Sequence, residues 1–231
     1  MDWTQHCTAV IPCFNEAGTI ARVIAGVRRF VPRLVVVDDG SADDTAATAR
    51  SAGAEVLSLP SNSGKGAALR AGLERAGANG FTWALTLDGD GQHSPDDIPA
   101  FFARAEATAA ALVIGDRLGN PAGMPWLRRR VNGWMTRRLA RLTGATLGDS
   151  QCGFRLLHLK AWSGLTLKAS RFEVESEMLV AFLAAGHALE FVPIQVINQT
   201  RPSRIHPLWD TGRWFRWWWS CCGSRPAGRP V

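Results

Sequence analysis

The sequence lacks any run of 18 apolar residues, the length that a membrane-spanning helix needs. Its opening segment, MDWTQHCTAVIPC, contains neither the basic nor the apolar region of a secretory signal peptide. Its five cysteines are an odd number, and their spacing matches neither a zinc site nor a disulfide framework. We therefore expect a cytoplasmic protein that does not cross the bilayer.

Lysine is scarce, and charge of either sign is unevenly distributed. Residues 1–116 contain 9 basic and 14 acidic side chains, whereas residues 117–231 contain 17 basic and 6 acidic ones. This surplus of positive charge predicts an anionic partner for the second half, such as nucleic acid, a phosphorylated ligand or a membrane surface. Arginine supplies most of the positive charge, and its guanidinium group can bind a phosphate through two parallel hydrogen bonds.

The remaining composition is that of a globular α/β protein. The 231 residues, 46% of them hydrophobic and 20% charged, are enough for one large domain or a domain with a small appendage. Short apolar runs predict strands at residues 8–12, 34–39, 54–59, 81–88, 111–115 and 188–194. Helical periodicity predicts helices at about 16–30, from 41 onward, and at 67–78, 94–107, 125–142 and 173–186. Strands joined by single helices predict a mainly parallel sheet, whose ligands bind at the carboxyl ends of the strands.

The segment LTLDGDGQH at 85–93 carries the clearest chemical pattern. Two carboxylates, Asp88 and Asp90, follow the end of a predicted buried strand and are flanked by glycine. With the amide oxygen of Gln92 they form a set of hard oxygen ligands that suits Mg²⁺ or Mn²⁺. A cation at this position can bridge the phosphates of a nucleoside diphosphate.

Two other nucleotide-binding motifs are absent. The loop SNSGKG has no Ser or Thr after its lysine and lacks the spacing of a Walker loop, and no GxGxxG occurs. Lys65 of that loop is instead either an electrostatic neighbour of the acidic site or a solvated lysine at the start of a helix.

Seven motifs occur in order along the chain and together resemble the family 2 glycosyltransferases. The resemblance covers about residues 8–210 and is closest to the dolichyl- and polyprenyl-phosphate mannosyl- and glucosyltransferase branch. The motifs are IPCFNEAGTI, VVVDDGSADDT, NSGKGAALRAGLERA, LTLDGDGQHSPDDIP, VIGDR, GDSQCGFRLL and FEVESEML.

This resemblance implies a single GT-A domain with helices on both faces of the sheet, and an inverting transfer from a nucleotide sugar, GDP-mannose or a UDP-hexose. It places Asp88, Asp90 and Gln92 at the metal and diphosphate positions. Arg117 and a basic residue of RPSRIHP, Arg201 or Arg204, would lie near the donor phosphates. The residues expected to line the nucleotide are Pro12, Phe14, Glu16, Val37, Asp39, Asp88 and Gly89.

The acceptor implied by the resemblance is a polyprenyl phosphate. Its phosphate oxygen is already anionic and needs no general base. If the acceptor were a lipid or glycan hydroxyl, a base would be required. Asp149 is the candidate, and its alternative role is that of a structural residue that caps the GDSQCGF turn. A single-strand nucleic-acid-binding module is a further alternative from another class, but it does not account for DGDGQH at a strand end, and we expect no nucleic acid partner.

The C-terminal region predicts contact with a membrane surface. We expect residues 1–200 to form the catalytic domain, with a nucleotide-sugar half at 1–117 and an acceptor half at 118–200. The tail 201–231 mixes tryptophan with arginine, residue types that favour the lipid headgroup zone. Segments 125–142 and 208–222 would therefore attach the protein peripherally to the inner face of the cytoplasmic membrane.

Overall fold

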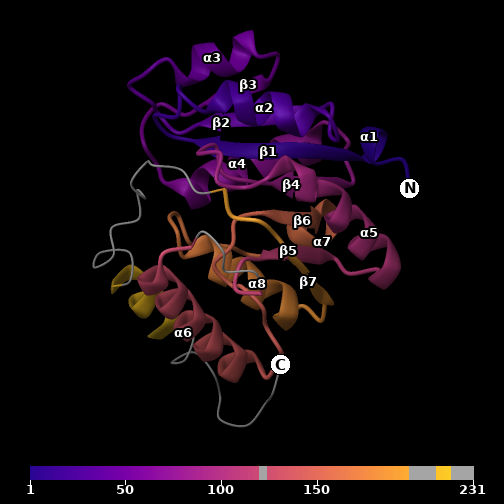
Figure 1. The fold of residues 1–231 in the computed structure, drawn as a ribbon, viewed down its shortest axis with the longest axis vertical. Coiled ribbons are helices and arrows are strands. Elements are labelled where there is room, and N and C mark those ends of the chain that lie inside the picture. The colour runs from indigo at the N-terminus through magenta and orange to yellow at the C-terminus, as the bar shows by residue number, and fades with distance from the viewer. Residues whose placement is uncertain (120–123, 198–211, 220–231) are drawn as a thin grey trace.

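A seven-stranded sheet forms the centre of the computed structural model, which describes residues 1–119, 124–197 and 212–219 (Figure 1). The strand order is β3-β2-β1-β4-β6-β5-β7. The strands are β1 (Cys7–Cys13), β2 (Leu34–Asp38), β3 (Glu55–Ser58), β4 (Trp83–Thr86), β5 (Leu112–Asp116), β6 (Arg155–His158) and β7 (Leu189–Pro193).

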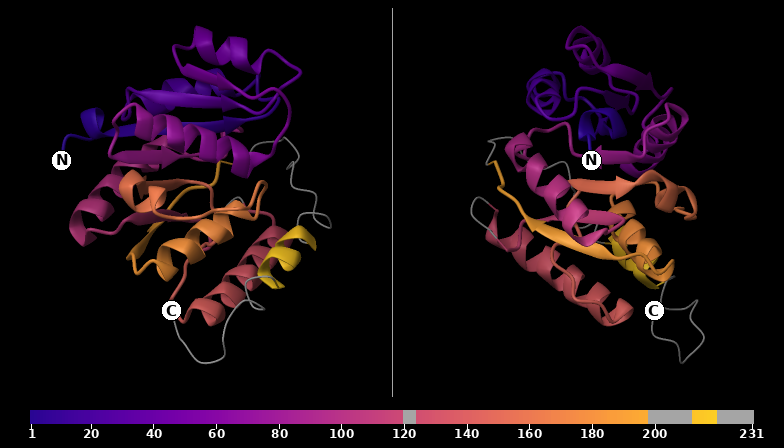
Figure 2. Two further views of the ribbon diagram at one scale, coloured as in Figure 1. Left: turned by 180° about the vertical axis from the view of Figure 1, so that it is seen from behind. Right: turned by 90° about the vertical axis from the view of Figure 1, so that its right-hand side faces the viewer.

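Helices flank the sheet on both faces (Figure 2). They are α1 (Trp3–His6), α2 (Ile20–Arg28), α3 (Thr45–Ser51), α4 (Lys65–Ala78), the 3₁₀ turn η1 (Pro95–Asp97), α5 (Ile98–Thr108), α6 (Trp126–Thr143), α7 (Leu159–Ser163) and α8 (Val174–Ala184). Residues 212–219 form one more helical segment, which lies beside α6 in Figure 1 and in the left view of Figure 2 and packs on α6 through Trp214.

The sheet is mainly parallel, as the sequence predicts. β1 pairs in parallel with β2 and β4, β2 with β3, and β5 with β7. β6 alone runs antiparallel, between β4 and β5. Because β6 is reversed, the other six strands share one direction, and the residues just before β6 reach the edge at which those six strands end.

Burial on both faces explains why the central strands read as continuous apolar runs. Every residue of β2 is buried, and so are six of the seven residues of β1. On one face, α4 approaches β1 closely at Gly72, where a Cβ atom would overlap the side chain of Val10.

The expected elements differ from the observed ones in several places. The strand expected at 81–88 ends at Thr86, so both acidic residues of DGDGQH lie in the loop after it. β6 and the short helices α1 and α7 were not expected, and the helix expected at 94–107 is divided into η1 and α5.

Candidate active site

Polar residues gather at the sheet edge where the parallel strands end. Asp39 follows β2, Asp88 and Asp90 follow β4, and Arg117 follows β5. The antiparallel direction of β6 brings Asp149, from the loop before that strand, to the same edge. This is the expected position for a ligand site in an open α/β sheet.

Lys65 joins two carboxylates at this edge. Its Nζ atom lies 2.5 Å from Asp88 Oδ1 and 2.6 Å from Glu175 Oε1, so α4, the β4 loop and α8 meet at one cation. Burial acts to lower the pKa of Lys65, but Asp88 and Glu175 outweigh it and hold the pKa above its ordinary value. Burial acts to raise the pKa of Asp88, but Lys65 outweighs it and holds Asp88 ionised.

Asp90 lies in the opposite electrostatic situation. Burial and the nearby negative charge of Asp88 raise the pKa of Asp90 to about 6. Its Oδ1 atom accepts a hydrogen bond from the backbone N–H of Gln92 at 2.9 Å. Two carboxylates that repel each other at a strand end are the donor set that a divalent cation stabilises.

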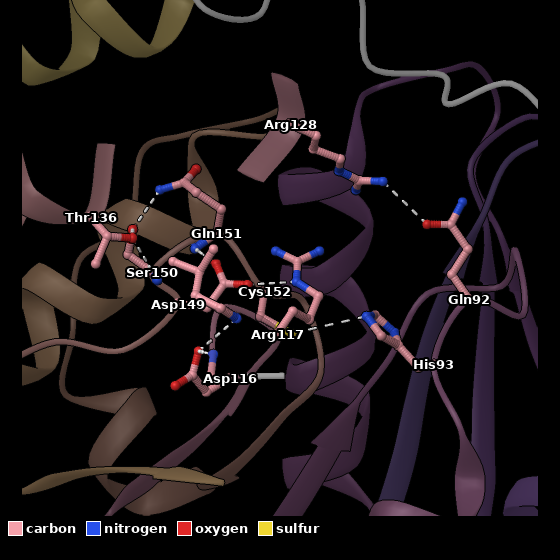
Figure 3. A network of polar contacts seen from close by, with 12 residues as sticks. Gln92, His93, Asp116, Arg117, Arg128, Thr136, Asp149, Ser150, Gln151 and Cys152 are labelled. Carbon is pink, nitrogen blue, oxygen red and sulfur yellow. Dashed lines mark hydrogen bonds and ion pairs between the residues drawn. The ribbon is translucent and has the colours of Figure 1, made fainter. Parts of the chain in front are cut away.

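The metal positions predicted from the sequence are Asp88, Asp90 and Gln92, and the structure places them in one loop. The Gln92 amide oxygen accepts a hydrogen bond from Arg128 Nη1 at 3.3 Å (Figure 3). Among the described residues, no group of three or more His, Cys, Asp or Glu side chains is arranged to hold a metal ion. The set therefore consists of two carboxylates and one amide oxygen, and its role as a metal site stays a prediction.

His93 contacts the backbone of Asp88. Its Nδ1 atom accepts a hydrogen bond from the Asp88 backbone N–H at 3.4 Å, and its Nε2 atom lies 3.9 Å from Cys152 Sγ. Burial lowers the pKa of His93 to about 4, so the ring is neutral at pH 7. These contacts orient the Asp88 backbone.

Arg117 and Asp149 form the most buried ion pair of the site (Figure 3). Arg117 Nε donates to Asp149 Oδ2 at 2.6 Å, and the Asp149 side chain is fully buried. Burial acts to lower the pKa of Arg117, but Asp149 outweighs it and keeps the guanidinium group charged. Arg117 Nη2 is also buried and has no hydrogen-bond partner within the described parts of the chain. A buried charged donor without a partner is costly, and an anionic ligand would satisfy it.

The residues expected to line the nucleotide lie at or beside the ends of β1 and β2, except Asp88 and Gly89, which follow β4. Pro12 and Val37 belong to the strands themselves, and Phe14 and Glu16 to the loop after β1. Gly89 O accepts a hydrogen bond from Thr19 Oγ1 at 2.8 Å. Asp39 accepts hydrogen bonds from two backbone N–H groups, those of Ser63 at 2.7 Å and Gly64 at 2.8 Å, and so anchors the glycine-rich loop. The contact of these residues with a nucleotide stays a prediction.

Three contributors to the site were missed from the sequence. Glu175 binds Lys65. Arg155 is 1% exposed and donates to three backbone carbonyls, those of Ser150, Cys152 and Glu175, at 2.8 to 3.0 Å. Gly153 lies against the charged pair, since a Cβ atom there would be 2.7 Å from Lys65 Nζ. The motifs GDSQCGFRLL and FEVESEML contain all three, but nothing in them indicates that Glu175 and Gly153 meet Lys65 or that Arg155 joins the two motifs.

Arg201 and Arg204, expected near the donor phosphates, lie outside the described residues, as do 208–211 and 220–222 of the expected membrane segment.

Comparison with known proteins identifies the family. The model of glycosyl transferase family 2 matches residues 8–163. The chain belongs to glycosyl transferase family 2. The chain is 34% identical to glycosyltransferase AglJ of Haloferax volcanii, over 87% of this chain and 67% of that protein. It is 29% identical to UDP-N-acetylglucosamine--dolichyl-phosphate N-acetylglucosaminyltransferase of Methanococcus voltae, over 81% of this chain and 84% of that protein.

The fold agrees with this family. Glucosyl-3-phosphoglycerate synthase of Mycobacterium tuberculosis, crystallised with Mn²⁺, UDP and phosphoglyceric acid, superposes with a TM-score of 0.72. The identity is 24%, and the match covers 96% of this chain and 80% of that one. The expected GT-A fold, family and resemblance to the polyprenyl-phosphate branch are confirmed.

Proposed function

We propose that this family 2 glycosyltransferase moves a hexose from GDP-mannose or a UDP-hexose to a polyprenyl phosphate, with inversion at the sugar C1. The observation that carries the proposal is Arg117. Its charge is buried, its Nε atom is held by Asp149, and its Nη2 atom has no partner among the described residues. A phosphate oxygen satisfies such a donor, and both the donor and the acceptor bring phosphates to this edge.

Asp88, Asp90 and Gln92 fit a divalent cation, because their oxygens are hard ligands. A cation would also offset the burial and the repulsion from Asp88 that together raise the pKa of Asp90. When bound, Mg²⁺ or Mn²⁺ would supply positive charge to the leaving nucleoside diphosphate. The chain's own contribution is to hold Asp88 ionised through Lys65 and to aim Arg117 at the phosphates. The nucleotide would lie on Pro12, Phe14, Glu16, Val37, Asp39 and Gly89.

The surroundings of Asp149 favour a phosphate acceptor over a hydroxyl acceptor. Asp149 Oδ2 accepts from Arg117 Nε, and Asp149 Oδ1 accepts from the Gln151 backbone N–H at 3.0 Å. Both carboxylate oxygens are therefore occupied, and the side chain is fully buried. In that position Asp149 orients Arg117, whereas a general base must reach the hydroxyl proton that it removes. A polyprenyl phosphate requires no such base.

The proposed site of action is the cytoplasmic face of a membrane, reached by peripheral binding. None of the helices among residues 1–119, 124–197 and 212–219 is long and apolar enough to cross a bilayer. Exposed aromatic side chains nevertheless occur on α6 and residues 212–219, where Trp126 is 71% exposed and Trp219 72% exposed. The exposed arginines of α6 are Arg129, Arg130, Arg137 and Arg141. Interleaved tryptophan and arginine suit an anionic headgroup surface.

The test is nucleoside diphosphate release from a panel of nucleotide sugars, with and without undecaprenyl phosphate. We expect release from one donor only, dependent on the lipid phosphate, and abolished by EDTA and by Asp90→Ala. Asp96→Ala is the matched control, because Asp96 is a nearby surface carboxylate paired only with the exposed Arg29 among the described ion pairs. The proposal is contradicted if nucleoside diphosphate release does not depend on the lipid phosphate. It is also contradicted if release continues both in the presence of EDTA and in the Asp90→Ala variant.

A further inference from the structure

Residues 212–219 carry one tryptophan that is buried rather than exposed. Trp214 is 2% exposed and packs against Met135 and Leu139 of α6, in a small apolar cluster separate from the main core. Trp219 on the same segment is 72% exposed and Phe215 41% exposed. One side of the segment is therefore fixed to the protein, and another side is free to meet a lipid surface.

A chain of hydrogen bonds leads from this tryptophan to the loop before β6. Trp214 Nε1 donates to Ser176 Oγ, in the first turn of α8, at 2.8 Å. Gln151 Nε2 donates to the same oxygen at 2.8 Å and to Ser150 Oγ at 2.8 Å. Ser150 in turn shares a hydrogen bond of 2.9 Å with Thr136 of α6 (Figure 3).

This series of hydrogen bonds then continues to the sheet edge at which Arg117 lies. The backbone N–H of Gln151 donates to Asp149 Oδ1 at 3.0 Å, and Asp149 Oδ2 accepts from Arg117 Nε at 2.6 Å (Figure 3). The lipid-facing segment and the proposed phosphate-binding arginine are thus linked by groups in direct contact.

Gln151 and Ser176 each make two of these hydrogen bonds. The two N–H groups of the Gln151 amide donate to two different hydroxyls, and the Ser176 oxygen accepts from two donors. Ser150, Ser176 and Asp149 are each completely buried, so water does not readily replace a partner that is lost. Displacing Trp214 therefore alters the hydrogen bonding of Gln151, and through it the loop that fixes Asp149.

The position of residues 212–219 depends on their surroundings. A helix much shorter than about 12 residues is marginal in water by itself, so packing must hold this segment in place. A lipid surface that binds its exposed aromatic side chains, together with the arginines of α6, stabilises the docked position further.

We propose that Trp214, Ser176 and Gln151 are positioning residues that couple the binding of residues 212–219 to an anionic lipid surface with the placement of Arg117 for phosphate. The inference rests on the proposed function, because it takes Arg117 to be the group that binds a diphosphate. Lipid binding then favours the docked segment, which holds Asp149 and Arg117 in the arrangement that binds phosphate more tightly.

The test measures binding rather than turnover. The dissociation constants of GDP and UDP, each with Mn²⁺, are determined by calorimetry with and without vesicles of phosphatidylglycerol and phosphatidylcholine. For the wild type we expect the vesicles to tighten binding of the preferred nucleotide about tenfold, within the usual range of coupling between two sites. Trp214→Phe and Ser176→Ala lose this tightening, although both proteins still float with the vesicles.

Ser176→Ala keeps the packing of Trp214 and so tests the hydrogen bond if Trp214→Phe fails to fold. Trp162→Phe is the matched control, since Trp162 Nε1 is buried without a hydrogen-bond partner in the described residues and lies on α7. The double variant Trp214→Phe/Ser176→Ala should lose no more than either single variant.

Vesicles that leave nucleotide binding of the wild type unchanged overturn the inference, as does tightening that persists in both single variants. A wild type that binds neither nucleotide overturns the proposed function, and the inference with it.

Discussion

The two buried cations of the site, Lys65 and Arg117, have different partners and are therefore suited to different roles. Lys65 has two acidic partners, Asp88 and Glu175, so its charge is fully compensated within the protein. Arg117 has one, Asp149, and retains a buried donor without a partner among the described residues. Lys65 is therefore suited to organising the acidic loop, and Arg117 to meeting the substrate.

Gly153→Ala tests the role of Lys65. The added methyl group would lie 2.7 Å from Lys65 Nζ and 3.1 Å from Asp88 Oδ1, so the lysine must move and the ion pair is disrupted. Because the displaced atom is the end of a flexible side chain, we expect folding to be kept and kcat/KM to fall about tenfold or more.

The matched control is Gly77→Ala. A Cβ at this position in α4 meets nothing within 4 Å, so this variant should gain about 1 kcal/mol of stability and keep full turnover. Thermal melting and steady-state kinetics separate the two effects. Unchanged turnover of the Gly153→Ala protein would contradict the role of Lys65 in organising the acidic loop.

Arg117→Lys tests the guanidinium group itself. Lysine keeps the positive charge but cannot hold Asp149 and a phosphate oxygen with one planar group. We expect kcat/KM to fall about 100-fold, the usual effect of removing one donor that stabilises developing charge. Arg104→Lys, at a half-exposed ion pair with Glu190, should change little. Equal losses in the two variants would contradict the role of Arg117.

The sequence was enough to predict the polar residues that follow the strands. Asp88, Asp90 and Arg117 are recognisable because each comes directly after an apolar run, and such ends meet at one edge of a parallel sheet. Glu175 and Ser176 were not recognisable, because their partners Lys65 and Gln151 are remote in the sequence. Their contacts depend on how α8 packs.

At the scale of elements, α6 and residues 212–219 form the proposed lipid-facing surface. Helix α6 was expected at 125–142 and is observed at Trp126–Thr143, because helical periodicity is a local property of the sequence. β6 was missed because a four-residue strand has little periodicity, and its antiparallel pairing is decided by β4 and β5. That reversed strand positions the loop containing Asp149.

Charge reversal on α6 tests this surface. Arg130→Glu with Arg137→Glu should weaken binding to phosphatidylglycerol vesicles about tenfold or more, since each basic residue near an anionic membrane contributes about 1 kcal/mol. Arg22→Glu with Arg33→Glu is the matched control, because both residues are exposed and lie outside the proposed surface. Vesicle flotation measures the difference, and equal loss in the two double variants would show nonspecific attraction only.

At the scale of the whole molecule, alternating strands and helices predicted the fold class, and the uneven charge pointed to an anionic partner of the second half. The boundary between a catalytic domain at 1–200 and a tail at 201–231 stays a prediction. Within that tail, residues 212–219 pack on α6 and hydrogen-bond to α8 through Trp214.

Thiol chemistry reports on the integrity of this fold. Cys7, Cys13 and Cys152 are buried, and burial raises the pKa of the Cys152 thiol to about 11. At pH 8 we expect iodoacetamide to leave all three unmodified in the native protein and to modify them in concentrated urea. Peptide mass mapping gives the answer, and rapid native labelling of Cys152 would indicate that the loop before β6 is open.

The acid stability of the labelled lipid product distinguishes transfer to a phosphate from transfer to a hydroxyl. Wild-type protein is incubated with the preferred radiolabelled nucleotide sugar, Mn²⁺ and undecaprenyl phosphate, and the lipid is extracted and treated with mild acid. A sugar joined through phosphate is released under conditions that leave an ordinary glycosidic bond intact. We predict that the label enters the lipid and is released by mild acid. Label that stays attached, or that enters lipid only when a hydroxyl acceptor is supplied, would contradict transfer to a polyprenyl phosphate and favour Asp149 as a general base.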